Sequence, residues 1–436
     1  MNIPISKYPR VVIVGGGFAG ISIAKHLLKE KLQVVLLDRH NYHTFQPLLY
    51  QVSTSGLEPD SIAYPLRKIT RHSTDGYFRL TEVQRIVPEE NKVITSIGEL
   101  AYDYLVLATG SRTNFFGNES IQKNAMWMKT IPQALNIRSL ILENLEQAVI
   151  TPDPVKRKAL LNFVIAGAGP TGVELCGAIA EVRNHIVPRD FRDLDPSEMK
   201  IHLIEGLERV LPPMSPEASK KAEKFLKDLG VEIHLNVMVQ EYDGQKVITN
   251  KEDLSFNTST FIWAAGVSGA PVEGLNASAV VDKADRYEVN VFNQVKGYEN
   301  IFAIGDIALM SNEDFPKGHP MVAQPAIQQG KHLAKNLKHI LKGEKMEPFV
   351  YNDKGTMATV GRNKAVVDLG KLKFGGFFAW FIWMFIHLYF LVGFRNRLIT
   401  FFNWVYNYVN FDKAARLIIR PFKSNKENLE VDQKKV

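Results

Sequence analysis

Cysteine is almost absent from this chain, and its scarcity removes several kinds of chemistry. The 436 residues contain one cysteine, Cys176. A lone cysteine excludes an internal disulfide, a Cys-x-x-Cys redox pair and a zinc or iron–sulfur centre built from cysteines. It also favours a reducing, cytoplasmic compartment. We expect Cys176 to be a packing residue.

Two further patterns are missing. Residues 1–10 are polar and interrupted by proline, so no secretory signal is expected. The 11 histidines are scattered, and only His40 and His43 lie close together. We find no group of Asp, Glu and His residues with metal-ligand spacing and no EF-hand pattern. The sequence therefore predicts no metal site.

The overall charge is mildly basic. Lys and Arg number 53 against 46 Asp and Glu, a surplus of 7, and the pI is about 9.1. This surplus permits contact with acidic lipid or with nucleic acid. No nucleic-acid recognition motif appears, and the basic residues of the C-terminal tail lie beside aromatic and aliphatic ones. We therefore expect an anionic lipid surface as partner and no nucleic acid.

The first apolar run opens directly into a glycine-rich turn. Val11–Val14 predicts a strand, Gly15–Gly20 a turn, Ile21–Glu30 a helix, and Val34–Leu37 a second strand that ends at Asp38. The turn has G-x-G-x-x-G spacing, in which the glycines allow a tight turn, a close pyrophosphate and close helix–strand packing. Asp38 can accept hydrogen bonds from a ribose. We therefore predict a dinucleotide site here.

The same pattern recurs later in the chain. Phe163–Ala166 predicts a strand, Gly167–Gly172 a turn, Val173–Arg183 a helix, and Ile201–Ile204 a strand that ends at Glu205. A carboxylate at this position repels a 2′-phosphate, so NADH is favoured over NADPH; a solvated strand end is the alternative. Two dinucleotide sites in one chain allow a flavin in one and NADH in the other, with hydride transfer between them.

The spacing between the second turn and its acid is unusual. Glu205 follows the turn at more than the usual ~20 residues. We attribute the excess to an insertion around Asn184–Glu198.

Three further apolar runs end in small residues, and these are Tyr104–Ala108 before Thr109-Gly110, Phe261–Ala265 before Gly266, and Ile301–Ile304 before Gly305-Asp306.

From about Arg10 to about Arg397 the sequence resembles the type II NADH dehydrogenases. These are single-subunit, non-pumping NADH:quinone oxidoreductases of the two-dinucleotide-binding-domain flavoprotein superfamily. The motifs that carry the resemblance are NYHTFQPLLYQ (41–51), AGPTGVE (168–174), WAAGV (263–267), IGD (304–306) and AQPAIQ (323–328). Several are shared across the superfamily, and the last one points to quinone reduction.

The resemblance implies an α/β fold with two Rossmann-like dinucleotide-binding domains plus a C-terminal membrane-associating helical segment. We expect a discontinuous FAD-binding domain of residues 1–112 and 290–370, an NADH-binding domain of residues 113–289, and membrane-anchoring amphipathic helices with a polar tail in residues 371–436. FAD is the implied cofactor, NADH the substrate and a membrane quinone the acceptor. A homodimer is expected from the resemblance alone.

The candidate cofactor residues lie in the two glycine turns and the short motifs. Those assigned to FAD are Gly15, Gly16, Gly17, Phe18, Ala19, Gly20, Asp38, Arg39, Thr109, Gly110, Asp306, Ala323 and Gln324. Those assigned to NADH are Gly167, Gly169, Gly172, Glu205, Ala265 and Gly266. By the resemblance, Asp306 contacts the ribityl chain and Ala323-Gln324 lies beside the isoalloxazine ring.

The candidate catalytic residues are Glu174, Gln324 and Gln328. Glu174 lies one turn into the second helix among apolar neighbours, which should raise its pKa and let it shuttle a proton. The resemblance places the family's proton-relay glutamate here; the alternative is an acid that stabilises the helix start. Gln324 and Gln328 are four residues apart and share a helix face, where neutral amides suit quinone carbonyls. The alternative is a polar helix face.

The C-terminal segment is rich in aromatic residues. Gly375–Phe394 holds 20 uncharged residues, enough for one spanning helix. Arg395 follows, and then Arg397, Thr400, Asn403, Asn407 and Asn410 recur at every third or fourth position among apolar residues, with Arg416 and Arg420 beyond. This pattern predicts monotopic attachment to the cytoplasmic face of the cell inner membrane, with Gly375–Phe394 covering the quinone entry. A spanning helix and a dimer interface are the alternatives.

One departure from the family pattern concerns proton transfer. Some bacterial members carry a lysine in the C-terminal segment near flavin and quinone. Gly375–Phe394 contains no lysine, and we do not transfer the role to Lys371 or Lys373. A second proton partner for Glu174 is therefore left open.

Two other functions remain to be weighed. One is a soluble NAD(P)H-dependent flavoprotein reductase of the ferredoxin or rubredoxin reductase type, which needs neither the aromatic tail nor the glutamine pair. The other is a non-catalytic nucleotide sensor, against which the complete motifs argue. Disulfide reductases and sulfide:quinone oxidoreductases need cysteines that this chain lacks.

Overall fold

The computed structural model describes residues 1–419 except 72, 282–283, 371 and 411–414. The chain divides into two compact units, and neither is continuous in sequence. Unit 1 comprises Met1–Thr44, Ala63–Arg112 and Val267–Lys354; unit 2 comprises Phe45–Ile62, Thr113–Gly266 and Gly355–Val436.

Unit 1 is built on a five-stranded parallel sheet of order β22-β9-β1-β2-β5. Its strands are β1 (Arg10–Val14), β2 (Gln33–Asp38), β5 (Gly76–Leu80), β9 (Tyr104–Leu107) and β22 (Ile301–Ala303). Alternate residues of β1 enter different cores, Val11 and Ile13 on one face and Val12 and Val14 on the other. Because both faces are covered, the strand is apolar throughout rather than alternating.

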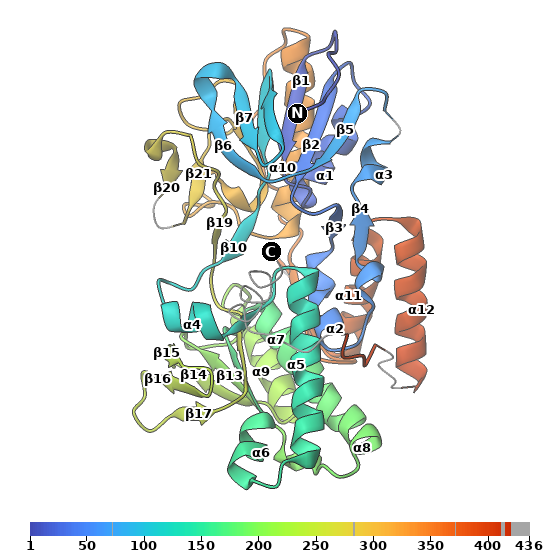
Figure 1. Cartoon of the computed structure of the whole chain (residues 1–436), viewed down its shortest axis with the longest axis vertical. Coiled ribbons are helices and arrows are strands. Elements are labelled where there is room, and N and C mark those ends of the chain that lie inside the picture. Colours follow the sequence, from blue (N-terminus) through green and yellow to red (C-terminus); the bar gives the residue numbers. More distant parts are fainter. Residues whose placement is uncertain (72, 282–283, 371, 411–414, 420–436) are drawn as a thin grey trace, which may run out of the picture. The chain divides into compact units, whose positions relative to one another are not determined.

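The layers that cover this sheet differ in kind. Helices α1 (Phe18–Leu27) and α10 (Ala323–Leu341) lie side by side (Figure 1) and fill the first core. Their approach is close, since a Cβ on Gly330 of α10 would lie 2.7 Å from the carbonyl oxygen of Ala19. Shorter elements complete the unit, namely α3 (Arg67–Thr70), β3 (Tyr42–Thr44), β4 (Ala63–Pro65), β6 (Val83–Val87), β7 (Lys92–Thr95), β8 (Gly98–Ala101), β20 (Val280–Val281), β21 (Arg286–Glu288) and β23 (Ala308–Leu309).

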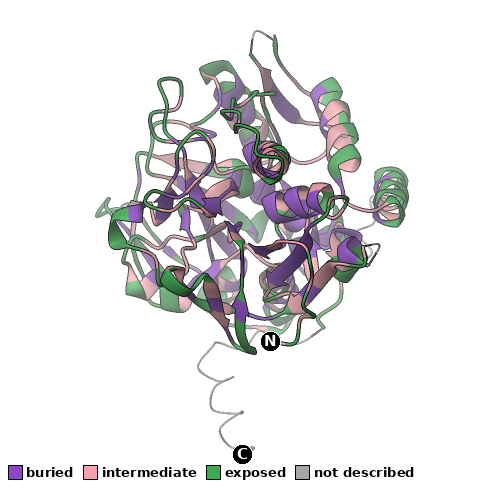
Figure 2. Ribbon diagram, turned by 90° about the horizontal axis from the view of Figure 1, so that it is seen from above, coloured by how far each residue is buried: buried purple, intermediate pink, exposed green. Residues whose placement is uncertain are grey.

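Unit 2 repeats the plan around a second five-stranded parallel sheet of order β11-β18-β12-β13-β14. Its strands are β11 (Met126–Trp127), β12 (Asn162–Ala166), β13 (Lys200–Glu205), β14 (Glu232–Leu235) and β18 (Thr260–Trp263). Helix α7 (Pro170–Glu181) packs on one face, and the three strands β15 (Val239–Tyr242), β16 (Lys246–Thr249) and β17 (Ser255–Asn257) cover the other. Figure 2 shows buried residues in purple along the strands.

Unit 2 also contains shorter strands and several helices. They are α2 (Leu49–Ser53), α4 (Glu119–Asn124), α5 (Ile131–Ile150), α6 (Pro154–Leu160), α8 (Val187–Asp190), α9 (Pro216–Asp228), β24 (Thr356–Thr359), β25 (Ala365–Leu369), β26 (Leu372–Gly375), α11 (Phe377–Phe390) and α12 (Phe394–Asn410). Of these, α2, α9 and β24 contact α7. The two-stranded pair of β10 (Ser111–Thr113) and β19 (Val267–Gly269) lies where the chain passes from one unit to the other. Cys176 is fully buried in the core beside α7, which confirms its packing role.

The two predicted βαβ units are confirmed, with both helices starting earlier than expected. The first begins at Phe18 and the second at Pro170, because Gly17 and Gly169 are the extended residues just before each helix. The predicted insertion before Glu205 is also found. A π-helical turn at Val182–Ile186 prolongs α7, and α8 follows before β13 begins.

The two units depart from the expected domain division in three places. The segment 267–289 belongs to unit 1, because β21 pairs with β23 there. Phe45–Ile62 leaves unit 1 between the paired strands β3 and β4 and packs α2 on α5 and α7 of unit 2. Residues 355–370 join unit 2 through the β24-β25-β26 sheet. Sequence order alone gives no sign of these excursions.

The C-terminal segment forms two helices rather than one long one. Helix α11 has 14 residues and ends at Phe390, and α12 begins at Phe394 after a break that contains Gly393 at φ +96°. Among the described residues no helix is both long and apolar enough to cross a bilayer. The alternative of a spanning helix over Gly375–Phe394 is therefore wrong.

Candidate functional site

The first glycine turn has the geometry of a phosphate cradle. Gly15 has φ +106°, and a Cβ there would lie 2.3 Å from the carbonyl oxygen of Ala108; a Cβ on Gly20 would lie 1.8 Å from that of Gly15. In contrast, a Cβ on Gly17 would meet nothing within 4 Å. The protein thus fills the space around the outer glycines and leaves the middle one open, as close approach of a pyrophosphate requires. These residues fit FAD.

The carboxylate that follows this turn is fixed by the backbone. The amide of Gly16 donates to Oδ2 of Asp38 at 2.6 Å, and that of His40 donates to Oδ1 at 2.7 Å. A carboxylate offers about four acceptor positions, so two remain for ribose hydroxyls. Phe18 packs edge-on against His43, and burial lowers the pKa of that histidine to about 4. Arg39 is exposed directly after β2.

The second glycine turn repeats this geometry closely. Gly167 has φ +100°, with its Cβ position 2.6 Å from the Ala265 nitrogen, and a Cβ on Gly172 would lie 1.9 Å from the Gly167 carbonyl oxygen. Gly169 again has nothing within 4 Å. The amide of Ala168 donates to Glu205 at 2.6 Å. These residues fit the adenine-ribose half of NADH.

The short motifs at the ends of neighbouring strands complete each cradle. Gly110 and Gly266 follow β9 and β18 and both have positive φ, +72° and +77°. The hydroxyl of Ser111 donates to Asp306 at 2.6 Å. The Thr109 hydroxyl is buried and has no hydrogen-bond partner within the described part of the chain, so an acceptor on a bound cofactor would complete it.

Helix α10 begins at Ala323 with no side-chain cap, and the two predicted glutamines follow on its first turns. Gln328 donates to the Asn352 carbonyl at 2.9 Å and accepts from the Asn352 amide at 3.0 Å. Gln324 accepts from the Lys354 amide at 3.3 Å. The shared face is as expected, and both ends of the Gln328 amide hold the backbone of Asn352. A role of Gln328 toward a quinone stays a prediction.

Glu174 lies where the sequence placed it and is buried. It is 8% exposed in the core beside α7, and burial raises its pKa to about 8, partly offset by the backbone amide of Thr359. At neutral pH this carboxyl therefore holds a proton. A group with a pKa close to the working pH is suited to both giving and taking a proton.

A chain of hydrogen bonds approaches Glu174 from the C-terminal helices. Trp404 of α12 donates through its indole N–H to Gln51 at 2.8 Å, and the Gln51 amide donates to the Tyr50 hydroxyl at 3.0 Å. That hydroxyl lies 3.0 Å from the hydroxyl of Thr359, whose backbone amide contacts Glu174. No local pattern predicts this series of hydrogen bonds, because Tyr50 and Thr359 are 309 residues apart.

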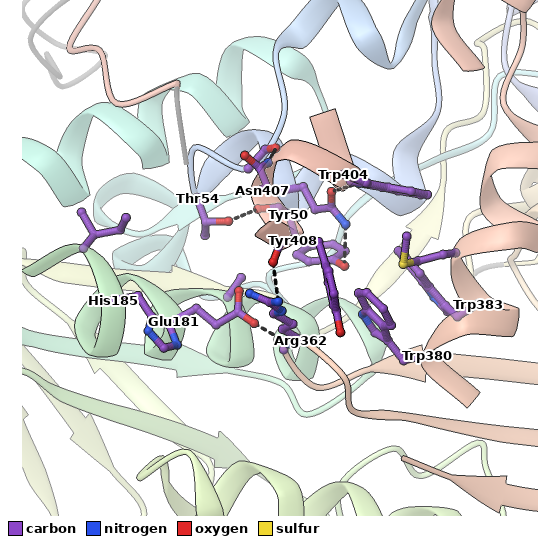
Figure 3. Close-up of a pocket in the computed structure, with 16 residues that line it drawn as sticks. Tyr50, Thr54, Glu181, His185, Arg362, Trp380, Trp383, Trp404, Asn407 and Tyr408 are labelled. Carbon is purple, nitrogen blue, oxygen red and sulfur yellow. Dashed lines mark hydrogen bonds between the residues drawn. The ribbon is translucent and has the colours of Figure 1, made fainter. Parts of the chain in front are cut away.

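A pocket opens beside this chain of hydrogen bonds, within unit 2 (Figure 3). Its volume is about 130 Å³, roughly ten times the space of about 10–15 Å³ that one water needs. Trp380, Trp383, Trp404 and Tyr408 from α11 and α12 form an aromatic wall. The Arg362 guanidinium lies 3.9 Å from the ring centroid of Tyr408 in this wall, and the Arg362 backbone amide donates to Glu181.

Helices α11 and α12 each expose a row of apolar side chains, while Trp383 and Trp404 are buried. Exposed aromatic and aliphatic residues recur at about every fourth position, namely Phe377, Phe381, Phe385 and Tyr389 on α11 and Phe394, Leu398, Phe402, Val405 and Val409 on α12. Some polar residues of α12 face inward, since Asn396 and Thr400 are buried and Asn407 donates to the Gly56 carbonyl at 3.0 Å, whereas Arg397 and Asn410 are exposed.

Two members of the predicted polar stripe, Thr400 and Asn407, therefore face the protein. Arg416 forms an ion pair with Asp190 at 2.7 Å instead of extending a free basic face. Arg420 lies outside the described residues. Arg395 and Arg397 remain exposed at the junction of the two helices.

The expectation of no clustered metal-type ligands is also corrected. His202, Glu232 and His234 come together on β13 and β14, with their ligand atoms within 4.8 Å of one another. The sequence missed this group because its members come from two strands that are adjacent only in the sheet.

The comparisons with known proteins agree with this geometry. Residues 9–330 match the family model of the pyridine nucleotide-disulphide oxidoreductases, and residues 354–410 match that of the NDH2 C-terminal domain. Type II NADH:quinone oxidoreductase NdhA of Mycobacterium tuberculosis is 38% identical over 91% of this chain and 86% of its own length. Type II NADH:quinone oxidoreductase of Staphylococcus aureus is 28% identical over 82% of this chain and 89% of its own.

A solved structure agrees in fold. NDH2 from Plasmodium falciparum in complex with NADH superposes with a TM-score of 0.85 at 22% identity, covering 95% of this chain and 100% of that one. The two cradles, the buried glutamate and the C-terminal domain therefore have one common explanation: this chain belongs to the type II NADH:quinone oxidoreductases.

Proposed function

We propose that this chain oxidises NADH and reduces a membrane quinone by two electrons, without pumping protons. The observation that carries the proposal is the pair of matched cradles, one in each unit, with a buried carboxyl one turn into the second. FAD, when bound, supplies the ring that accepts hydride from NADH and passes two electrons to the quinone. In unit 1, Gly15–Gly20, Asp38 and Asp306 hold that cofactor.

Unit 2 binds and orients NADH. The open Gly169 admits the pyrophosphate, and the start of α7 directs free amides and the positive end of its dipole toward it. Glu205 holds the adenine ribose and repels a 2′-phosphate. Its two carboxylate oxygens already accept from the amides of Ala168 and Leu207, so its position is fixed before the substrate arrives.

Glu174 supplies protons during quinone reduction. Its carboxyl carries a proton at neutral pH because burial disfavours the charged form. The Thr359 backbone amide contacts this carboxyl, and the Thr359 hydroxyl lies 3.0 Å from that of Tyr50, which lines the pocket. We assign to these two hydroxyls the second proton partner that the C-terminal segment, without a lysine, does not provide. Gln324 at the start of α10 stays the candidate donor to a quinone carbonyl.

The aromatic pocket of unit 2 receives the apolar tail of the quinone. Three tryptophans and a tyrosine from α11 and α12 line it, in keeping with the expected cover over the quinone entry. The outward apolar faces of the same helices bury themselves in lipid headgroup and acyl regions, and Arg395 and Arg397 attract anionic lipid. We place this attachment on the cytoplasmic face of the inner membrane and expect a homodimer.

A steady-state assay with NADH and a soluble quinone analogue tests the proposal. The FAD-loaded protein should turn over both the quinone and an artificial dye, and Glu174→Gln should keep flavin and dye activity while quinone reduction slows. A soluble flavoprotein reductase would reduce the dye but not the quinone, and a nucleotide sensor would reduce neither. Failure of the protein to reduce quinone, with or without dye reduction, would contradict the proposed quinone reduction. Unchanged quinone turnover in Glu174→Gln would contradict the proposed role of Glu174.

A further inference from the structure

We propose that His202, Glu232 and His234 form a binding site for a divalent transition metal of the zinc type, on the NADH-binding unit and separate from its cradle residues. His202 lies on β13, and Glu232 and His234 lie on the neighbouring edge strand β14. In the parallel register His202 is opposite Glu232 and Ile204 is opposite His234. Residues two apart on a strand point to the same face, so Glu232 and His234 flank His202 from one side of the sheet.

The distances match tetrahedral coordination. Nδ1 of His202 lies 3.2 Å from Nε2 of His234 and 3.4 Å from a carboxylate oxygen of Glu232. Metal–ligand bonds of about 2.0–2.1 Å in a tetrahedron put neighbouring ligand atoms about 3.3–3.4 Å apart. Two of the three separations therefore already match zinc spacing, and all three donor atoms lie within 4.8 Å of one another, with one coordination position left for water.

The surroundings of the cluster suit a metal ligand in several respects. The ring of Phe256 on β17 lies 4.6 Å from that of His202 and 5.2 Å from that of His234, which limits the movement of both imidazoles. His202 is buried while Glu232 is exposed, which gives an ion a path from solvent.

Two lysines oppose the binding of a cation. Lys200 and Lys158 both lower the pKa of His202 by charge repulsion, whereas Glu232 favours a positive charge there. The donor set of two imidazoles and one carboxylate selects Zn²⁺, Co²⁺, Ni²⁺ or Cu²⁺ over Mg²⁺ and Ca²⁺, which take oxygen ligands. The bound ion would tie the edge strand β14 to β13.

The test uses untagged, FAD-loaded full-length protein freed of metal by a chelator. Zn²⁺ binding is measured by equilibrium dialysis with metal analysis, and Co²⁺ is added in parallel to record its visible difference spectrum. We expect one Zn²⁺ per chain, a raised midpoint of thermal unfolding, and the intense bands of tetrahedral Co²⁺. Mg²⁺ should produce none of these changes.

The variants are chosen so that the fold survives. Glu232→Gln and His234→Gln change exposed or half-exposed positions and should each weaken Zn²⁺ binding by roughly tenfold or more. His339→Gln removes a histidine that pairs with only one carboxylate, that of Glu344, and should leave binding unchanged. Lys158→Gln should tighten it.

Two results would overturn the proposal. One is equal Zn²⁺ stoichiometry and affinity in the unmodified protein, Glu232→Gln and His234→Gln. The other is a weak, octahedral Co²⁺ spectrum. After either result, the contact between His202 and His234 would be an ordinary hydrogen bond between neutral imidazoles.

Discussion

The two glycine turns of this chain are nearly identical in backbone geometry but differ one helical turn later. In both, the outer glycines are crowded by backbone and the middle one is open, and an acid accepts a hydrogen bond from the loop. At corresponding positions, seven residues after the first glycine, α1 carries Ser22 and α7 carries Glu174. The Ser22 hydroxyl donates to the Ile327 carbonyl at 2.8 Å and fastens α1 to α10.

Glu174 has a different environment, because burial raises its pKa to about 8. The comparison separates two levels of information. The glycine turn is common to both units, whereas the residue on the next turn differs: Ser22 links two helices, and Glu174 is a buried carboxyl with a raised pKa. The following predictions test that separation, beginning with the largest effect.

Gly20→Ala and Gly172→Ala should each disable one cradle and spare the other. The added Cβ would lie 1.8 Å and 1.9 Å from a backbone carbonyl oxygen, a clash that a side chain cannot relieve. Gly20→Ala should lose FAD and all activity, whereas Gly172→Ala should remain yellow and fail to oxidise NADH. Flavin absorbance and NADH binding by calorimetry measure the two losses.

The matched controls for these variants are Gly17→Ala and Gly169→Ala. Both positions are open, so these variants should fold normally and lose only cofactor or substrate affinity. If both controls failed to fold, the protein itself would need the space at the middle glycine, and that space would not be reserved for the cofactor.

Glu174→Gln should slow quinone reduction by about 10²–10⁴, the usual contribution of general acid–base catalysis, and Ser22→Ala should change it little. Stopped-flow traces of NADH oxidation and quinone reduction separate the two half-reactions. In the unmodified protein quinone reduction should fall as pH rises through about 8, where the Glu174 carboxyl loses its proton. A pH profile that is identical in Glu174→Gln would contradict this assignment.

The same carboxyl should reduce stability in alkali. Its pKa is raised in the folded state, so the folded protein binds the extra proton between about pH 4.5 and 8 and loses stability as pH rises through that window. The cost above pH 8 is on the order of 5 kcal/mol at most. At pH 9, Glu174→Gln should therefore unfold at a higher temperature than the unmodified protein. Near-equal unfolding midpoints of the two proteins at pH 9 would argue against a buried acid.

Phe402→Asp should weaken membrane attachment without disturbing either cradle. Phe402 is 63% exposed on the outward face of α12, and an added charge there makes insertion into lipid costly. Flotation with vesicles that contain anionic lipid should show release of this variant but not of Phe402→Leu, with dye activity unchanged in both. Retention of Phe402→Asp on the vesicles would place the attachment elsewhere.

Glu205→Gln should give the smallest effect, since it removes only the repulsion of a 2′-phosphate. We expect the ratio of kcat/KM for NADH over that for NADPH to fall by roughly tenfold, which corresponds to about 1.4 kcal/mol. Steady-state kinetics with both nucleotides measure it. A ratio that does not change would favour a solvated strand end as the role of Glu205.

Local patterns were sufficient to predict the cradles and the buried acid. A glycine turn between a strand and a helix is defined by nearby residues, and the apolar neighbours of Glu174 already predicted its burial. The features that depend on contacts between residues distant in the sequence were not predicted. The pairing of Tyr50 with Thr359, the use of Gln328 by the backbone of Asn352 and the excursion of Phe45–Ile62 into unit 2 all require contacts that no local period encodes.

The sequence predicts an amphipathic α12 for attachment to a membrane surface, but it leaves open which face of the helix turns toward the protein. A stripe of polar residues normally marks the solvent face of a helix. Here Asn396, Thr400 and Asn407 face a partly polar protein surface, and the apolar residues face outward, where a bilayer replaces water. An amphipathic period shows that a helix has two faces, but the surrounding medium decides which face turns outward.

The most direct test of the whole account is a visible spectrum of the purified protein, recorded without oxygen. It should show the yellow absorbance of a bound flavin, which NADH bleaches and a quinone analogue then restores. A colourless protein that stays colourless after incubation with FAD, or a flavin that NADH bleaches but quinone does not restore, would contradict the account.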